Sequence, residues 1–156
     1  MGTYALTCPT EIVNAPIDVV WALLTTPERW GDFYDIRDVR ADPPGHAVVG
    51  QKCRGESGPR IFHFAVRFEY LEIDEAKHRL VVDVTLPLGM RVREDLDCIA
   101  SGAAQCRVNY HCAFTFADGL RGRVVRALMG RELEMGPRDS LMRLKRAAER
   151  ASAARS

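Results

Sequence analysis

Four consecutive segments in the middle of the chain alternate apolar and polar residues with a period of two. They run from Arg60 to Ile73, Leu80 to Leu86, Met90 to Ile99 and Gln105 to Phe116. Short turns join them, and this pattern is typical of an antiparallel meander with one face toward water and one toward a core. Because an apolar sheet face must be covered by another layer, the pattern predicts an α+β fold.

The residues before the meander predict further strands and two short helices. The stretch Tyr4–Val13 is rich in β-formers, and an apolar stripe from Ile17 to Leu24 indicates a helix. Pro27 opens a second short helix, Glu28 to Phe33, and period two then predicts strands near 36–42 and 46–54. Together these segments predict a curved sheet of about six to seven strands.

The end of the chain predicts the cover for that sheet. Apolar residues recur there at intervals near three and four, which is typical of an amphipathic helix. Gly136-Pro137 is expected to kink this helix, and the apolar phase carries through the kink. We therefore expect one long kinked helix across the concave face, with an apolar stripe formed by Leu120, Val124, Leu128, Met129, Leu133, Leu141, Leu144 and Ala148.

Length, charge and cysteine spacing narrow the class of protein. The 156 residues carry a net charge of +1, contain no linker or repeat, and predict a single domain, 1–156, present as a monomer or homodimer. The first ten residues lack the features of a secretory signal, so we expect a cytoplasmic protein. The five cysteines include no CxxC pair, so we expect reduced thiols, no metal site and no cofactor.

Residues 120–156 are basic, with nine Arg and one Lys against four acids, a net charge of +6. A basic amphipathic helix either has a solvated charged face or makes weak contact with an anionic membrane, and both interpretations stay open. We expect no nucleic-acid partner.

The order of elements resembles the START-like superfamily, also called SRPBCC, including its polyketide cyclase and lipid-transport branch; the fold of this superfamily is the helix-grip fold. The resemblance covers nearly the whole chain. Its most specific stretches are Glu11–Trp21 with Pro27–Trp30, which is similar to the family's first strand exit and short helix pair, and Asp139–Lys145, which is similar to its final helix. These motifs specify the fold and not the function, because members include ligand carriers, lipid-transfer proteins and polyketide cyclases.

The resemblance implies a hydrophobic cavity between the sheet and the C-terminal helix. The alternative is that the same side chains form an ordinary core. The residues expected to line the cavity are those on the inward-facing parity of the strands, three aromatic residues near the short helices and two residues of the last helix: Trp30, Phe33, Tyr34, Phe62, Phe64, Val66, Phe68, Val82, Val84, Met90, Val92, Glu94, Leu96, Tyr110, Cys112, Phe114, Leu128 and Met129.

Glu94 and Tyr110 are the polar candidates on the inward parity. A buried carboxyl group needs a raised pKa, a partner or water, and a phenol can donate or accept a hydrogen bond. The two could orient a ligand or act as acid and base. Alternatively, Glu94 lies at a cavity opening or pairs with an arginine such as Arg126 or Arg131.

Two specific chemistries of the superfamily are not matched. Its aromatase/cyclases place an arginine on the inward parity of the strand that here carries Val66 and Phe68, whereas Arg67 has the outward parity. The oxygenase branch needs two histidines and a carboxylate with the spacing of a facial iron triad, which this sequence lacks.

The sequence therefore supports three alternative hypotheses for the function. The first is a non-catalytic carrier or sensor of a hydrophobic small molecule such as a lipid, polyketide or aromatic metabolite. The second is a polyketide aromatase/cyclase or dehydratase that uses Glu94 and Tyr110. The third is a membrane-apposed lipid-transfer protein that uses the basic face of residues 121–131.

Overall fold

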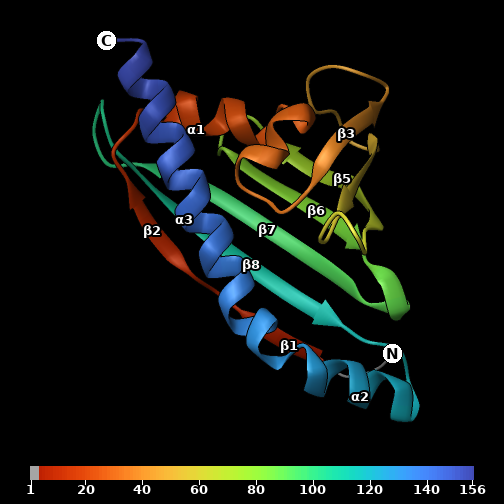
Figure 1. Ribbon diagram of the computed structural model, residues 1–156. Coiled ribbons are helices and arrows are strands. Elements are labelled where there is room, and N and C mark those ends of the chain that lie inside the picture. Colours follow the sequence, from red (N-terminus) through yellow and green to blue (C-terminus); the bar gives the residue numbers. More distant parts are fainter. Residues whose placement is uncertain (1–3) are drawn as a thin grey trace.

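The computed structural model describes residues 4–156, and it confirms an α+β helix-grip architecture in which a curved antiparallel sheet wraps a long C-terminal helix (Figure 1). The predicted domain, 1–156, includes three N-terminal residues that lie outside the described part. The elements are β1 (Tyr4–Thr7), β2 (Thr10–Val13), α1 (Ile17–Leu24), the 3-10 helix η1 (Pro27–Asp32), β3 (Arg37–Asp42), β4 (Lys52–Ser57), β5 (Phe64–Asp74), β6 (Arg79–Thr85), the 3-10 helix η2 (Pro87–Gly89), β7 (Arg91–Ala100), β8 (Cys106–Thr115), α2 (Gly119–Leu128) and α3 (Gly130–Ala154).

Within residues 4–156 the sheet has eight strands in the order β1-β8-β7-β6-β5-β4-β3, with β2 also paired to β8. All pairs are antiparallel, as the alternating segments predicted, and exposed and buried residues alternate along β4, β7 and β8. Two predicted strands have wrong bounds. Residues 46–51 form a loop before β4, and residues 60–63 form the turn between β4 and β5.

The first predicted strand is split in two at Cys8-Pro9. Pro9 has no N–H to donate to a neighbouring strand. Its carbonyl oxygen instead accepts the Tyr110 backbone N–H at 3.0 Å, so β1 and β2 both stay paired with β8.

The short helices close one end of the sheet with an aromatic cluster. The Trp30 indole stacks on Phe68 at a centroid distance of 4.4 Å, and its Nε1 donates to the Leu24 carbonyl at 3.1 Å. The Tyr70 hydroxyl donates to the same carbonyl at 3.0 Å. These bonds fix η1, and with it the chain that follows, against the inner face of β5.

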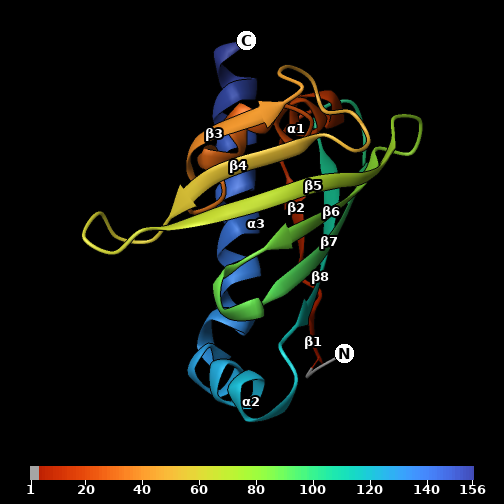
Figure 2. The same ribbon diagram turned by 90° about the vertical axis from the view of Figure 1, so that its right-hand side faces the viewer.

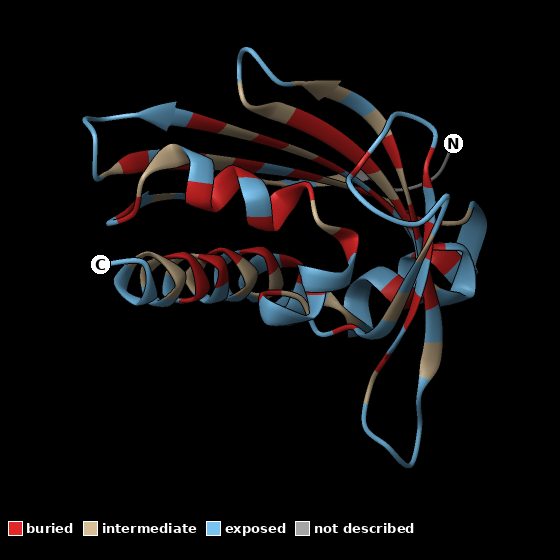
Figure 3. Cartoon of the chain, turned by 90° about the horizontal axis from the view of Figure 1, so that it is seen from above, coloured by how far each residue is buried: buried red, intermediate tan, exposed pale blue. Residues whose placement is uncertain are grey.

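The long helix α3 lies along the concave face, where Leu133, Leu141 and Leu144 are buried (Figures 1 and 3). As the apolar phase predicted, α3 runs through Pro137 without interruption. Pro137 cannot donate to the Leu133 carbonyl one turn earlier. The Thr7 hydroxyl donates to that carbonyl at 2.8 Å, so it stays satisfied.

The interruption lies at Met129, where the backbone (φ −92°, ψ 3°) separates α2 from α3. Figure 2 shows α2 past the main part of the sheet, at the end of the molecule. The predicted apolar stripe is therefore wrong for this segment, because Leu120, Val124 and Leu128 are exposed on α2. Gly122 permits the turn into α2, since an added Cβ would lie 1.7 Å from the Ala117 carbonyl oxygen.

Candidate functional site

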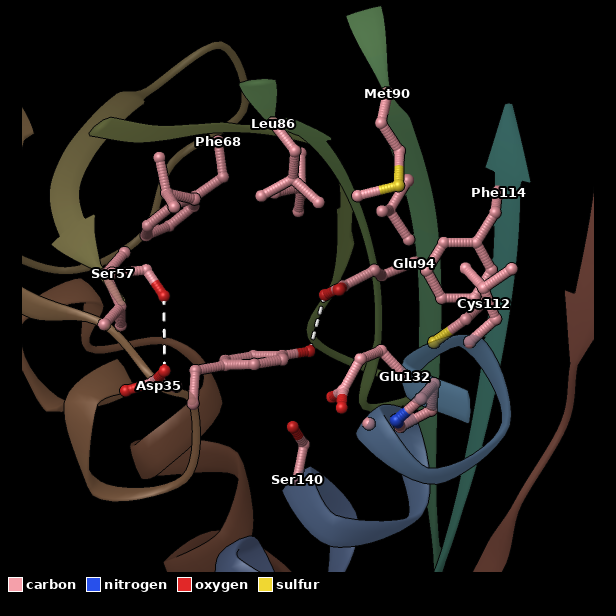
Figure 4. A pocket seen from close by; sticks show the side chains of 18 of the residues that line it. Asp35, Ser57, Phe68, Leu86, Met90, Glu94, Cys112, Phe114, Glu132 and Ser140 are labelled. Atoms are coloured by element: carbon pink, nitrogen blue, oxygen red, sulfur yellow. Dashed lines mark hydrogen bonds between the residues drawn. The ribbon is translucent and has the colours of Figure 1, made fainter. Parts of the chain in front are cut away.

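A cavity of about 230 Å³ lies between the concave face of the sheet, the chain after η1, and α3 (Figure 4). Its walls are mostly apolar. The predicted residues that line it are Trp30, Tyr34, Val66, Phe68, Val84, Met90, Val92, Glu94, Tyr110, Cys112, Phe114 and Met129. That these residues contact a ligand stays a prediction.

The other predicted lining residues lie elsewhere. Phe62 is 80% exposed because it belongs to the β4–β5 turn, and Leu128 is 80% exposed because α2 leaves the sheet. Phe64 is half-buried at the start of β5 and is not part of the wall. The remaining three are buried in the core and do not line the cavity: Phe33, Val82 and Leu96.

The cavity also has lining residues that the sequence analysis did not select. Leu133 and Pro137 share the apolar phase of the last helix, so the helical period could have identified them. Polar residues near the opening gave no such signal. The full set is Asp35, Ile36, Ser57, Leu86, Glu132, Leu133, Gly136, Pro137 and Ser140.

Three polar side chains from distant segments meet on the cavity wall. Glu94 lies on β7 and Tyr110 on β8. Leu96 lies two residues after Glu94, on the same face of β7, and pairs with Tyr110, so both polar side chains lie on the inner face of the sheet. Tyr34 enters from the chain after η1. Its hydroxyl donates to Glu94 Oε2 at 2.5 Å and makes a short hydrogen bond with the Tyr110 hydroxyl. The result is a connected network of two phenols and one carboxyl group.

The pKa values of the three groups in this network are raised above their ordinary values. Burial raises the pKa of Glu94 from 4.5 to about 7, and the hydrogen bonds from Tyr34 and Tyr110 limit that rise. Burial, then the nearby Glu94 charge, raises the pKa of both Tyr34 and Tyr110 well above 10. Near neutral pH, Glu94 can therefore both accept and release a proton, while the phenols stay protonated as hydrogen-bond donors.

Neither alternative interpretation of Glu94 agrees with the structure. The side chain is only 5% exposed, so it does not lie at the opening. Within residues 4–156 it forms no ion pair with Arg126 or Arg131, which are exposed on α2 and α3. Its partner is Tyr34.

The charged side chains on the mostly apolar cavity wall are acidic. Asp35 and Glu132 are exposed lining residues and so mark the opening, whereas Glu94 is buried. Figure 4 shows Glu94 from the sheet and Glu132 from α3 reaching into the same space. No Lys, Arg or His of the described chain lines the cavity. This electrostatic environment disfavours an anionic ligand.

Among residues 4–156, no three His, Cys, Asp or Glu side chains are grouped so that they could hold a metal ion. None of the helices in this part of the chain combines the length and the apolar character needed to cross a bilayer.

A family model described as polyketide cyclase/dehydrase and lipid transport matches residues 9–149. This chain belongs to that family. The polyketide cyclase/dehydrase and lipid transport family is of the SRPBCC type, so the resemblance seen in the sequence is confirmed. Family membership supports a role in binding a hydrophobic small molecule. A search of curated protein sequences finds no match to this chain.

Solved structures share the fold at low sequence identity. The Zhui aromatase/cyclase from Streptomyces sp. R1128 is 16% identical, covers 95% of each chain and has a TM-score of 0.73. A truncated norcoclaurine synthase from Thalictrum flavum is 13% identical, with 96% of this chain and 93% of the other covered and a TM-score of 0.70. The di-domain ARO/CYC BexL from the BE-7585A biosynthetic pathway is 19% identical, with a TM-score of 0.72 over 94% of this chain and 46% of that one.

Proposed function

We propose that this protein is an acid–base enzyme that acts on a compact, hydrophobic, carbonyl-bearing molecule of the polyketide type. The reaction class is proton abstraction next to a carbonyl group, followed by return of the proton, as in cyclisation or dehydration. The observation that carries this proposal is the network of Tyr34, Glu94 and Tyr110 on the wall of an apolar cavity.

Glu94 is the proposed acid and base. With a pKa of about 7, its carboxylate can take a proton from carbon near neutral pH, and the resulting acid can return it to a departing hydroxyl group. The apolar walls formed by residues such as Val92 and Phe114 reduce competition from water.

Tyr34 and Tyr110 are the proposed donors to the substrate carbonyl, toward which each hydroxyl would turn its single O–H from its present partner in the network. Negative charge develops on that oxygen when the adjacent carbon loses its proton, and a fixed hydrogen-bond donor stabilises this charge. Their raised pKa values keep both phenols protonated throughout the pH range in which Glu94 titrates. No arginine lines this cavity among the described residues, so the phenols take the place of a cation in polarising the carbonyl.

The sequence alone favoured a non-catalytic carrier or sensor, because the inward-facing residues are almost all apolar and include no nucleophile–base pair. The bond between Tyr34 and Glu94 changes that balance. A carrier does not need a carboxyl group that titrates near pH 7 inside an apolar cavity, and burying one has a cost.

The cavity also limits the ligand. Its volume of about 230 Å³ lies below the roughly 300–1,000 Å³ of drug-sized ligand pockets. A compact ring system fits this space better than a long acyl chain. Three carboxyl groups on the wall, from Asp35, Glu94 and Glu132, favour a neutral ligand over a carboxylate.

The test uses 2-tetralone, a compact bicyclic ketone with exchangeable protons next to its carbonyl. Proton NMR in D2O at pH 7 measures its rate of deuterium uptake with the wild-type protein and with Glu94→Gln. Glu134→Gln is the matched control, since Glu134 is exposed on α3 and lies away from the cavity.

We expect the wild-type protein and Glu134→Gln to accelerate exchange, and Glu94→Gln to lose about 10²-fold or more of that acceleration while still binding the ketone. Binding by the wild-type protein without faster exchange would overturn the enzymatic proposal in favour of a carrier. Equal acceleration by wild type and Glu94→Gln would remove Glu94 from the mechanism.

A further inference from the structure

The outer face of the sheet carries arginines in cross-strand register. Arg40 on β3 pairs with Arg54 on β4, and Arg54 pairs with Arg67 on β5. We call these three residues the arginine row. The same line across the sheet continues with Thr85 on β6 and Arg91 on β7. All of these side chains are exposed, and their parity in the strands is opposite to that of the cavity-lining Val66 and Phe68, so they lie on the face away from α3.

Such a row is unfavourable in an isolated sheet. Side chains directly opposite each other on neighbouring strands lie about 5 Å apart at Cβ, and like charges in these positions repel. Within residues 4–156, no carboxylate forms an ion pair with Arg40, Arg54 or Arg67. The repulsion in the row is therefore not relieved by a direct ion pair with any described residue.

Other outer-face arginines of the same sheet do have acidic partners. Arg79 contacts Asp95 at 2.6 Å and Glu72 at 3.0 Å, and Arg93 lies 3.6 Å from Glu72. The three arginines of the row therefore differ from Arg79 and Arg93 in having no acidic partner of the described chain within ion-pair distance.

A groove of about 490 Å³ runs beside the row on β4 to β7. Its cations are Lys52, Arg54, Arg67 and Arg91, and Thr85 adds a hydroxyl group. Its acids are Glu69 and Asp83, of which Asp83 pairs with Arg91. Positive side chains therefore outnumber acids in a concave site, which is the arrangement that concentrates anions.

We propose that this groove binds a small molecule with two or more phosphate groups. A guanidinium group presents parallel N–H donors that match two phosphate oxygens. Neighbouring strands lie about 4.8 Å apart, so Arg54 and Arg67, which line the groove on adjacent strands, can contact successive phosphates of one ligand. The ligand would supply the negative charge that the sheet lacks there.

This site is separate from the proposed active site. The cavity lies on the inner face and is lined by Asp35, Glu94 and Glu132 without a cation from the described residues, whereas the groove lies on the outer face and is basic. The proposal does not depend on the proposed enzymatic function, because it uses none of the same side chains except Phe68, whose strand borders both spaces.

The experiment measures binding of inorganic tripolyphosphate by isothermal titration calorimetry at pH 7.5 in 100 mM NaCl. The variants are Arg54→Gln and Arg67→Gln, with Arg107→Gln as the matched control, because Arg107 is an exposed arginine on β8 outside the groove. Arg54→Lys keeps the charge but not the paired donors, so it serves if the glutamine variant does not fold.

We expect a Kd below 1 mM for the wild-type protein and Arg107→Gln, about tenfold weaker binding by Arg54→Gln and Arg67→Gln, and weaker binding by Arg54→Lys. Without ligand, Arg54→Gln should melt at a higher temperature than the wild type, because it removes like-charge contacts. Tripolyphosphate should raise the melting temperature of the wild type more than that of the variant.

Three results would overturn the proposal. The first is no binding of tripolyphosphate, and the second is equal weakening in all three glutamine variants, which indicates only a general effect of net charge. The third is that duplex DNA or phosphatidylserine vesicles bind and tripolyphosphate does not, and that this binding is lost in Arg54→Gln. The row would then recognise a macromolecule or a membrane.

Discussion

Replacing Glu94 with glutamine should remove a pH-dependent loss of stability. In the unfolded chain this carboxyl group has its ordinary pKa of 4.5, and in the folded protein burial raises the pKa to about 7. The folded state thus binds the proton more tightly. The stability contributed by the protonated group is complete below pH 4.5 and is lost as the pH rises through 7.

The size of this loss follows from the two pKa values. Each pKa difference of one corresponds to about 1.4 kcal/mol, so the gap between 4.5 and about 7 is worth about 3 kcal/mol. A glutamine at this position keeps a carbonyl oxygen for the Tyr34 hydroxyl and does not ionise. Glu94→Gln and the wild type should therefore be similarly stable at pH 4, and the variant should be more stable by about 3 kcal/mol at pH 9.

Urea unfolding followed by tryptophan fluorescence at pH 4, 7 and 9 measures this difference. Glu134→Gln controls for the loss of one carboxylate, because Glu134 is exposed, and its stability should follow that of the wild type at each pH. A constant difference between Glu94→Gln and the wild type across this range would refute the argument that Glu94 is buried with a raised pKa.

Three further predictions address the cavity and α2. Tyr34→Phe removes a hydrogen bond that lowers the pKa of Glu94, so NMR titration of that carboxyl should give a pKa above 7; an unchanged value would contradict the bond. By calorimetry, naphthalenemethanol should bind at least tenfold more tightly than naphthoate, because the acidic side chains repel the carboxylate. Glu132→Gln should reduce this ratio of affinities severalfold. Equal affinities for the two ligands would show that the acidic side chains do not select the ligand. Wild-type protein should sediment with phosphatidylserine vesicles at low salt, and the double variant Leu120→Ser/Leu128→Ser should sediment less, because these leucines are exposed on a basic helix; absence of binding by the wild type would exclude membrane contact through α2.

The fold could be predicted because its main signal is local. Alternation of apolar and polar residues identifies each strand of the meander, and the helical period identifies the residues of α3 that pack on it. The pattern does not mark where a strand ends. Phe62 continues the parity of β5 yet lies in the β4–β5 turn, and Leu128 continues the period of the last helix although the backbone turns at Met129.

The candidate site could be predicted only in part. The inward parity of Glu94 and Tyr110 followed from their strands. Their connection through Tyr34 did not, because Tyr34 comes from an irregular segment 60 residues before Glu94, and its position depends on the packing of Trp30 against Phe68. Asp35 and Glu132 were missed for a related reason, since polar residues at an opening interrupt no hydrophobic pattern.

The arginine row shows the converse case. Each of its members has an ordinary outward position in its own strand, and nothing in a single segment distinguishes Arg54 from Arg93. Only the pairing of β3, β4 and β5 places Arg40, Arg54 and Arg67 side by side. The position of these arginines in the sequence therefore does not indicate a binding site, whereas their pairing across the sheet does.

The most direct test of the central claim is a carboxyl ¹³C NMR titration of Glu94 with and without 2-tetralone. The network of Tyr34, Glu94 and Tyr110 predicts that Glu94 titrates with a midpoint near pH 7 and that the ketone shifts both its resonance and its midpoint. A midpoint near 4.5, or a titration that the bound ketone leaves unchanged, would contradict the claim that this carboxyl group is an acid–base group of the ligand cavity.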